Sequence, residues 1–211
     1  MVQHENEQYQ NQAVVRLFSD VQSKSLNWLW YPYIPYGKVT ILQGDPGDGK
    51  TTFAVNVAAI LSKGGVFPEE SEAVKAANVI YQTTEDDYAD TIKPKLEAAG
   101  ADCQRVGFIS DREQNLTLED PRFEEAVRSM KAKLLIIDPI QAFVPKDGNL
   151  YQASKMRMSM QRLPWIAERY QCAILLIGHM TKSKNSKQLY RGLGSISRRP
   201  SGLRKTRVSY N

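Results

Sequence analysis

The segment from Gly44 to Thr52 carries residues that could bind a phosphate group. It reads Gly-Asp-Pro-Gly-Asp-Gly-Lys-Thr-Thr and follows an apolar run that begins at Val39. Glycines let the backbone curl so that successive N–H groups point inward at phosphate oxygens. A helical pattern over residues 53–61 follows directly, and the N-terminal end of a helix attracts anions. This order of strand, loop and helix predicts a site for a nucleoside triphosphate.

The residues of this loop have separate expected roles. Lys50 can place its charge on the terminal phosphates, and Thr51 can offer its hydroxyl to Mg²⁺. The residues expected to bind ATP are contiguous: Gly44, Asp45, Pro46, Gly47, Asp48, Gly49, Lys50, Thr51 and Thr52. A glycine-rich turn without a ligand is the alternative, and the flanking strand and helix favour the binding loop.

Two further apolar runs lead into acidic residues. Residues 134–137 are followed by Asp138, which a central strand would carry to the same sheet edge as the loop. Asp138 is therefore predicted to hold Mg²⁺, directly or through water, with a strand-capping turn as the other interpretation. The other run, residues 78–83, leads to Glu85, whose carboxylate could orient and deprotonate an attacking water. The same acids could cap a helix, and that role is assigned to Asp86 and Asp87.

Two other segments could contact a nucleotide. His179 follows an apolar run and could sense the γ-phosphate, although a structural histidine is equally consistent with this position. With Glu85 and Lys50, it completes the residues to which we assign catalytic roles. The aromatic segment from Leu26 to Tyr36 could stack on bases or on adenine. Packing of its rings against the core is the favoured interpretation.

A framework of alternating elements would position these residues. Apolar runs with β-branched residues predict strands at 39–43, 78–83, 106–110, 134–138 and 173–178. Helical patterns lie between them at 52–62, 91–98, 121–130 and 152–170. Asp120 and Gly100 are expected to cap helices, and Pro164 to kink or divide the last one. Such alternation predicts an α/β fold with a mostly parallel sheet flanked by helices.

Composition limits the remaining possibilities. The chain has 211 residues, which suits one sizeable α/β domain. No run approaches the about 20 apolar residues of a membrane span, and the polar N-terminus does not resemble a signal peptide. Cys103 and Cys172 are far apart and are expected to be buried free thiols. These features favour a cytoplasmic protein that does not contact a membrane.

The excess of positive charge lies at the C-terminal end of the chain. Residues 181–211 contain nine of the 28 Lys and Arg and no acid, which leaves 19 basic against 23 acidic residues elsewhere. Such a block can bind phosphate backbones, or it can be an accident of an unstructured tail.

Five motifs together resemble a known family. GDPGDGKTT, TTEDD, LLIIDP, GHMTK and RGLGSI occur in an order and spacing similar to the RecA-like AAA-family ATPases of the RepA hexameric helicase type. The resemblance covers residues 26–196, after a polar lead-in at 1–25. It implies a RecA-like P-loop fold, ATP with Mg²⁺, a homo-oligomeric ring and single-stranded DNA as a partner. It also implies that Glu85 is the catalytic base, that His179 is a sensor, and that Lys182 and Arg191 contact DNA or a neighbouring subunit.

The resemblance ends near Ile196. In that family Gly-Ser-Ile is normally followed by something like Asp-Phe-Ala-Ala-Ala and a further strand, whereas this chain continues Ser-Arg-Arg-Pro-Ser. Codons for the family sequence, read one base out of register, can give the observed one. We therefore expect residues 197–211 to be a frameshifted basic tail and the core to lack its C-terminal strands.

The expected activity is hydrolysis of MgATP coupled to single-stranded DNA in replication, recombination or repair. A DNA-independent regulatory module is the main alternative, and a remnant that binds ATP without turnover is a third possibility. A P-loop kinase is less consistent, because Glu85 suits a water nucleophile. Stimulation by DNA would favour the first interpretation, and phosphorylation of an acceptor would favour the kinase.

Overall fold

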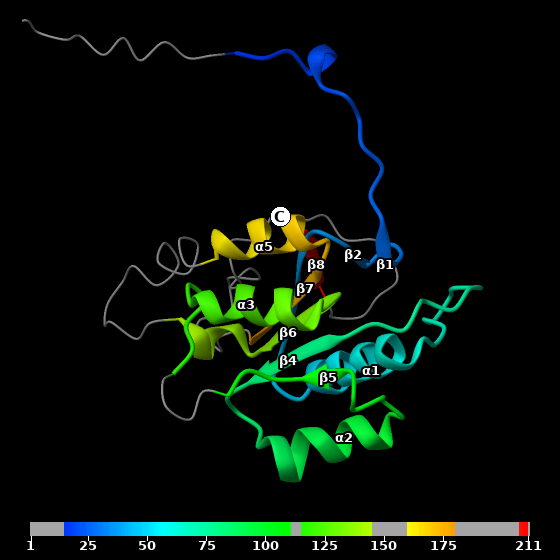
Figure 1. The fold of residues 1–211 in the computed structure, drawn as a ribbon, viewed down its shortest axis with the longest axis vertical. Helices are drawn as coiled ribbons and strands as arrows, with labels where there is room; N and C mark the ends of the chain where they lie inside the picture. The colour runs from blue at the N-terminus through cyan, green and yellow to red at the C-terminus, as the bar shows by residue number, and fades with distance from the viewer. Residues whose placement is uncertain (1–14, 111–114, 145–159, 180–206, 211) are drawn as a thin grey trace, which may run out of the picture.

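A six-stranded sheet forms the centre of the molecule, with the strand order β5–β4–β6–β7–β3–β8 (Figure 1). The computed structural model describes residues 15–110, 115–144, 160–179 and 207–210, with the backbone alone for 179 and 207–210. The sheet strands are β3 (Val39–Gly44), β4 (Val79–Thr83), β5 (Val106–Gly107), β6 (Leu134–Asp138), β7 (Ala173–His179) and β8 (Arg207–Tyr210). The helices are α1 (Lys50–Lys63), α2 (Lys93–Ala98), α3 (Pro121–Met130) and α5 (Arg162–Tyr170). Three short helical segments complete them: η1 (Phe18–Asp20), η2 (Tyr88–Ile92) and η3 (Ile140–Phe143).

The strands from β5 to β3 are parallel, which confirms the predicted α/β fold. Parallel pairing brings the carboxyl ends of the strands to one edge of the sheet. Gly44 pairs with His179 there, and Thr83 pairs with Asp138. β8 pairs antiparallel with β3, although the sequence analysis expected no strand in this segment.

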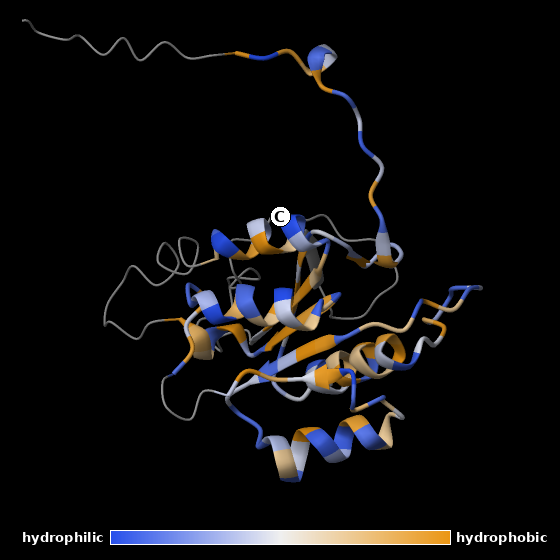
Figure 2. Cartoon of the chain, viewed as in Figure 1, coloured by the Kyte–Doolittle hydropathy of each residue, from blue (hydrophilic) through white to orange (hydrophobic). Residues whose placement is uncertain are grey.

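Helices cover both faces of the sheet because its central strands are apolar on both faces. Leu134 and Ile136 of β6 belong to a core cluster shared with α1 and α2. Leu135 and Ile137 belong to a second cluster shared with α3 and α5. Figure 2 shows these strands as an apolar interior, with polar residues on the surrounding helices α2, α3 and α5. A strand buried on both faces is typical of such a parallel sheet.

Most predicted boundaries agree with the structure. The side chain of Asp120 accepts a hydrogen bond from the Arg122 N–H at the start of α3, as its predicted capping role requires. Gly100 follows α2 with φ of 73°, as expected of a residue that ends a helix. The last predicted helix, residues 152–170, begins at Arg162 in the described chain, and residues 152–159 lie outside the described residues. Pro164 therefore lies in the first turn of α5, where a helix tolerates proline, and does not divide the described helix as predicted. β5 ends at Gly107, three residues before the predicted end.

A short hairpin of β1 (Trp28–Trp30) and β2 (Ile34–Pro35) precedes the sheet. The Trp30 ring stacks on Phe53 of α1 and on Phe67, with centroid distances of 5.6 and 5.1 Å. Packing against the core, rather than a free stacking surface, is therefore confirmed for this ring. The residues before the hairpin extend away from the sheet, with Phe18 94% exposed (Figure 1).

Two expectations from composition have different outcomes. Cys172 is buried, but Cys103 is exposed, so the prediction of two buried thiols is wrong for Cys103. Cys103 lies in the turn between α2 and β5 and belongs to neither core cluster. In the part of the chain that the structure describes, no helix has the length and apolar character needed to cross a membrane.

Candidate nucleotide-binding site

The loop between β3 and α1 has the backbone shape that phosphate binding requires. Gly47 and Gly49 have φ of 88° and 79°, values that residues with a side chain rarely adopt. Gly49 is the N-cap of α1 and provides no side-chain hydrogen bond to the helix. The first N–H groups of this helix therefore remain available to an anion.

Asp48 stabilises the loop from within. Its Oδ2 accepts a hydrogen bond from the Asp45 backbone N–H at 2.8 Å. A Cβ atom at Gly44 would lie only 2.7 Å from the same oxygen, so this approach needs glycine. The sequence analysis placed Asp45 and Asp48 in the binding loop but did not foresee their contact.

Lys50 is buried at the start of α1, with 5% of its surface exposed. Its Nζ donates hydrogen bonds to the carbonyl oxygens of Gly44, at 3.1 Å, and of Asp45, at 2.7 Å. The ammonium group is thus held inside the loop by the backbone. A bound phosphate would offer it a charged acceptor in the same place.

Thr51 and Asp138 meet although they are 87 residues apart in the chain. The Thr51 hydroxyl on α1 donates to Oδ2 of Asp138 at 2.8 Å. Asp138 ends β6, and β7 lies between β6 and the β3 strand that leads into the loop. The two oxygen-bearing side chains predicted to hold Mg²⁺ are therefore adjacent.

This donor set fits a hard cation. A hydroxyl and a carboxylate are ligands that Mg²⁺ accepts, with phosphate and water oxygens completing its coordination. Among the described residues, no group of three or more His, Cys, Asp or Glu could hold a metal. A cation at Thr51 and Asp138 would thus depend on the nucleotide for further ligands.

Tyr81 is a site residue that the sequence analysis missed. It is 1% exposed on β4, and its hydroxyl donates to Oδ2 of Asp138 at 2.9 Å. Burial, and then the negative charge of Asp138, raise the pKa of Tyr81 well above its usual value of 10.0. Tyr81 therefore remains a hydrogen-bond donor at neutral pH. Tyr81 pairs with Ile136 of β6, and Ile136 lies two residues before Asp138. Because alternate residues of a strand point to the same face, this register places Tyr81 on the face that carries the Asp138 side chain.

Glu85 lies exposed in the turn that follows β4. Its backbone N–H donates to the Thr83 hydroxyl at 3.3 Å. The Tyr88 hydroxyl closes this turn by donating to the Thr83 carbonyl at 2.8 Å. The turn thus holds the backbone of Glu85 near the carboxyl end of β4, beside the end of β6.

The two neighbouring acids have different partners. Asp87 is the N-cap of η2 and accepts hydrogen bonds from Ala89 and Asp90 N–H groups, which confirms its predicted role. Asp86 was predicted to cap as well, but its Oδ2 lies 3.0 Å from Nζ of Lys95 in an ion pair. The prediction for Asp86 is wrong because η2 begins at Tyr88, so that Asp87 is the N-cap residue.

The remaining predicted residues lie at or beyond the limit of the described chain. The backbone of His179 ends β7 and pairs with Gly44, which places it at the loop edge of the sheet. Lys182 and Arg191 lie outside the described residues.

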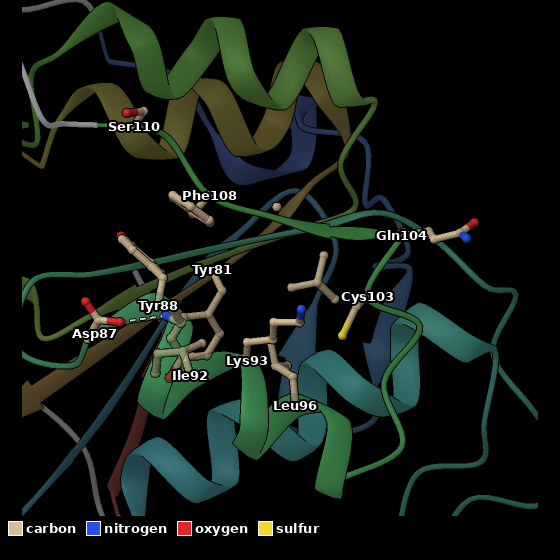
Figure 3. A pocket seen from close by; sticks show the side chains of 13 residues that line it. Tyr81, Asp87, Tyr88, Ile92, Lys93, Leu96, Cys103, Gln104, Phe108 and Ser110 are labelled. Carbon is tan, nitrogen blue, oxygen red and sulfur yellow. Dashed lines mark hydrogen bonds between the residues drawn. The ribbon is translucent and has the colours of Figure 1, made fainter.

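A cavity of about 590 Å³ lies away from the loop, between β4, β5 and the helices η2 and α2 (Figure 3). Its lining includes the rings of Tyr81, Tyr88 and Phe108 but none of the loop residues. Tyr88 and Phe108 stack with their ring centroids 3.9 Å apart. Tyr81 both lines this cavity and donates a hydrogen bond to Asp138.

The fold and the loop together define the P-loop class of nucleotide-binding proteins. The AAA domain family matches residues 4–185, well over half of the chain. The chain therefore belongs to the AAA domain family, among RecA-like P-loop ATPases that use nucleotides and usually Mg²⁺. It is also 28% identical over 169 residues to the DNA repair protein RadA of Halalkalibacterium halodurans. That similarity covers 77% of this chain and 32% of RadA, so the chain spans about a third of this relative's length.

Proposed function

We propose that this chain binds ATP with Mg²⁺ at the loop between β3 and α1, hydrolyses it, and couples hydrolysis to single-stranded DNA. The observation that carries the proposal is the contact between Thr51 and Asp138 at 2.8 Å. It joins the end of the phosphate loop to the acidic end of a central strand, as MgATP chemistry requires.

Catalysis in this proposal depends on position and charge. Lys50 and the N–H groups of the loop neutralise the phosphates. Thr51 and Asp138 would hold Mg²⁺, which when bound supplies positive charge to the phosphate oxygens. Glu85 orients the attacking water and accepts its proton. His179 senses the state of the terminal phosphate.

The DNA partner is supported by two separate features. The relative with 28% identity is described as a DNA repair protein. Lys182 and Arg191 belong to a basic segment, which suits contact with a phosphate backbone. We further propose that the chain forms a homo-oligomeric, RepA-like ring that acts in replication, recombination or repair.

Steady-state ATP hydrolysis with and without single-stranded DNA tests the proposal. The Lys50→Ala variant is expected to lose at least about 100-fold in turnover, because it removes the positive charge nearest the phosphates. The control is Lys63→Ala, which removes an exposed lysine at the other end of α1. Nucleotide affinity is measured in parallel with a fluorescent ATP analogue.

Each outcome separates the candidate functions. Turnover that rises with DNA and disappears in Lys50→Ala supports the proposal. Turnover that ignores DNA would favour the DNA-independent module. ATP binding without turnover would favour the non-hydrolysing remnant. Equal turnover in Lys50→Ala and the original chain would contradict the assignment of the loop.

A further inference from the structure

Tyr81 connects the cavity beside β5 with the acidic group of the candidate site. Its side chain lines the cavity (Figure 3). Its hydroxyl donates a hydrogen bond to Oδ2 of Asp138 at 2.9 Å. The ring is 1% exposed and belongs to the core cluster under α1. Burial of the ring in this cluster and the hydrogen bond to Asp138 restrict the direction in which the hydroxyl points.

Two hydroxyl groups donate to Oδ2 of Asp138, and they differ in their expected roles. Thr51 donates to this oxygen at 2.8 Å, and the lone pairs of its hydroxyl oxygen are also expected to coordinate a cation. The Tyr81 hydroxyl donates to the same oxygen at 2.9 Å from a buried ring. Its expected role is therefore to orient the carboxylate alone.

We propose that Tyr81 is a positioning residue for nucleotide hydrolysis: its hydroxyl holds the Asp138 carboxylate in the orientation that faces Thr51. This inference rests on the proposed function, because it assigns Tyr81 to the same site. Residues that orient a metal-binding carboxylate through a hydrogen bond affect metal affinity or activity without touching the metal.

The chain offers a matched comparison at Tyr170. The hydroxyl of Tyr170, on α5, donates to Oε1 of Glu124 on α3 at 3.0 Å. Tyr81→Phe and Tyr170→Phe therefore make the same chemical change, the loss of one tyrosine-to-carboxylate hydrogen bond. One change lies at the candidate site, and the other lies between two helices of the opposite layer.

The experiment measures ATP affinity in EDTA and in excess Mg²⁺ for the original chain and both variants. Tyr81→Phe is expected to leave the affinity in EDTA unchanged and to reduce the gain on adding Mg²⁺ by about 10-fold. Turnover at saturating ATP falls by a similar factor. Tyr170→Phe is expected to keep both the gain and the turnover. Thermal unfolding without nucleotide is expected to remain cooperative in both variants.

A double variant tests the route of the effect. If Tyr81 acts through Asp138, then Tyr81→Phe has no further effect on the Mg²⁺ gain in an Asp138→Asn background. A full Mg²⁺ gain in Tyr81→Phe would overturn the inference, and so would equal losses in Tyr81→Phe and Tyr170→Phe. Loss of cooperative unfolding in Tyr81→Phe would show a structural role and overturn it too. Failure of the original chain to bind ATP would instead contradict the proposed function.

Discussion

The two sides of β4 are held by different means. On one side, β4 pairs with β6 from Val79 to Thr83, along its whole length. On the other side, its pairing with β5 stops at Ile80. Beyond this point, the side-chain amide of Gln82 replaces the backbone ladder. Its Oε1 accepts from the Ile109 N–H at 2.9 Å, and its Nε2 donates to the Ile109 carbonyl at 3.3 Å.

This difference predicts that the two sides of β4 differ in local stability. The strands β3, β7, β6 and β4 fix the loop and Asp138 through continuous backbone pairing. The edge formed by β4, β5 and α2, which contains the cavity, depends on single side chains such as Gln82 and Tyr88. Cooperative units of different stability within one domain are the expected result.

The largest effect is expected from the centre of the sheet. Leu135 of β6 is 0% exposed, so Leu135→Ala should lower the free energy of unfolding by about 2–5 kcal/mol through lost burial and a cavity. Val106 of β5 is only partly buried, and Val106→Ala should cost about 1 kcal/mol or less. Urea unfolding measures both values, and equal losses at the two positions would contradict the distinction between centre and edge.

An intermediate effect is expected where a side chain replaces the ladder. Gln82 is 0% exposed, and Gln82→Ala leaves the Ile109 N–H and carbonyl without this partner. We expect a loss of about 1–3 kcal/mol, typical of a buried polar group that loses its hydrogen bond. Hydrogen exchange at the Ile109 amide should become faster, while exchange in β6 follows global stability alone.

Gln104→Ala is the control for this prediction, because Gln104 is exposed in the turn before β5. A change of less than about 0.5 kcal/mol is expected for such a surface position. Unchanged protection of Ile109 in Gln82→Ala would show that other contacts hold this edge.

The same difference explains which parts of the fold could be predicted from the sequence. Long apolar runs such as residues 134–138 fix a buried strand, because only one arrangement hides both faces. The end of β5 could not be predicted, because residues 108–110 keep a strand-like composition. The deciding group is the amide of Gln82, which lies 27 residues away in the chain. When a distant side chain takes the place of a strand partner, the local sequence of the strand does not show where the strand ends.

For the candidate site too, local motifs could be predicted from the sequence, whereas contacts between distant residues could not. The phosphate loop and the position of Asp138 could be predicted from local motifs, and the structure brings Thr51 and Asp138 together. Tyr81 could not be found from a motif, because a tyrosine inside an apolar strand is usually a core residue. Asp86 was misassigned because two adjacent acids are equivalent as helix caps until the first residue of the helix is known.

The smallest effect on the free energy of unfolding is expected for two acidic side chains in ion pairs, Glu124 on α3 and Asp86 beside α2. Glu124 accepts hydrogen bonds from Arg162 and Tyr170, which hold the pKa of its carboxyl below the usual value of 4.5. A carboxyl with a lowered folded-state pKa stabilises the protein above this pH, and the contribution is lost as pH falls through the folded-state pKa. Glu124→Gln should therefore reduce the loss of stability on acidification below pH 4.5.

Asp86 at the edge provides the contrast, since its ion pair with Lys95 is partly exposed. Such pairs contribute about 1 kcal/mol or less, so Asp86→Asn should change stability little. Urea unfolding from neutral pH to below pH 4.5 compares the two variants. A steeper acid response in Glu124→Gln than in the original chain would contradict the assigned sign. Gln keeps the size of the side chain but only one acceptor oxygen, so the variant removes the charge of Glu124 together with one of its two hydrogen bonds.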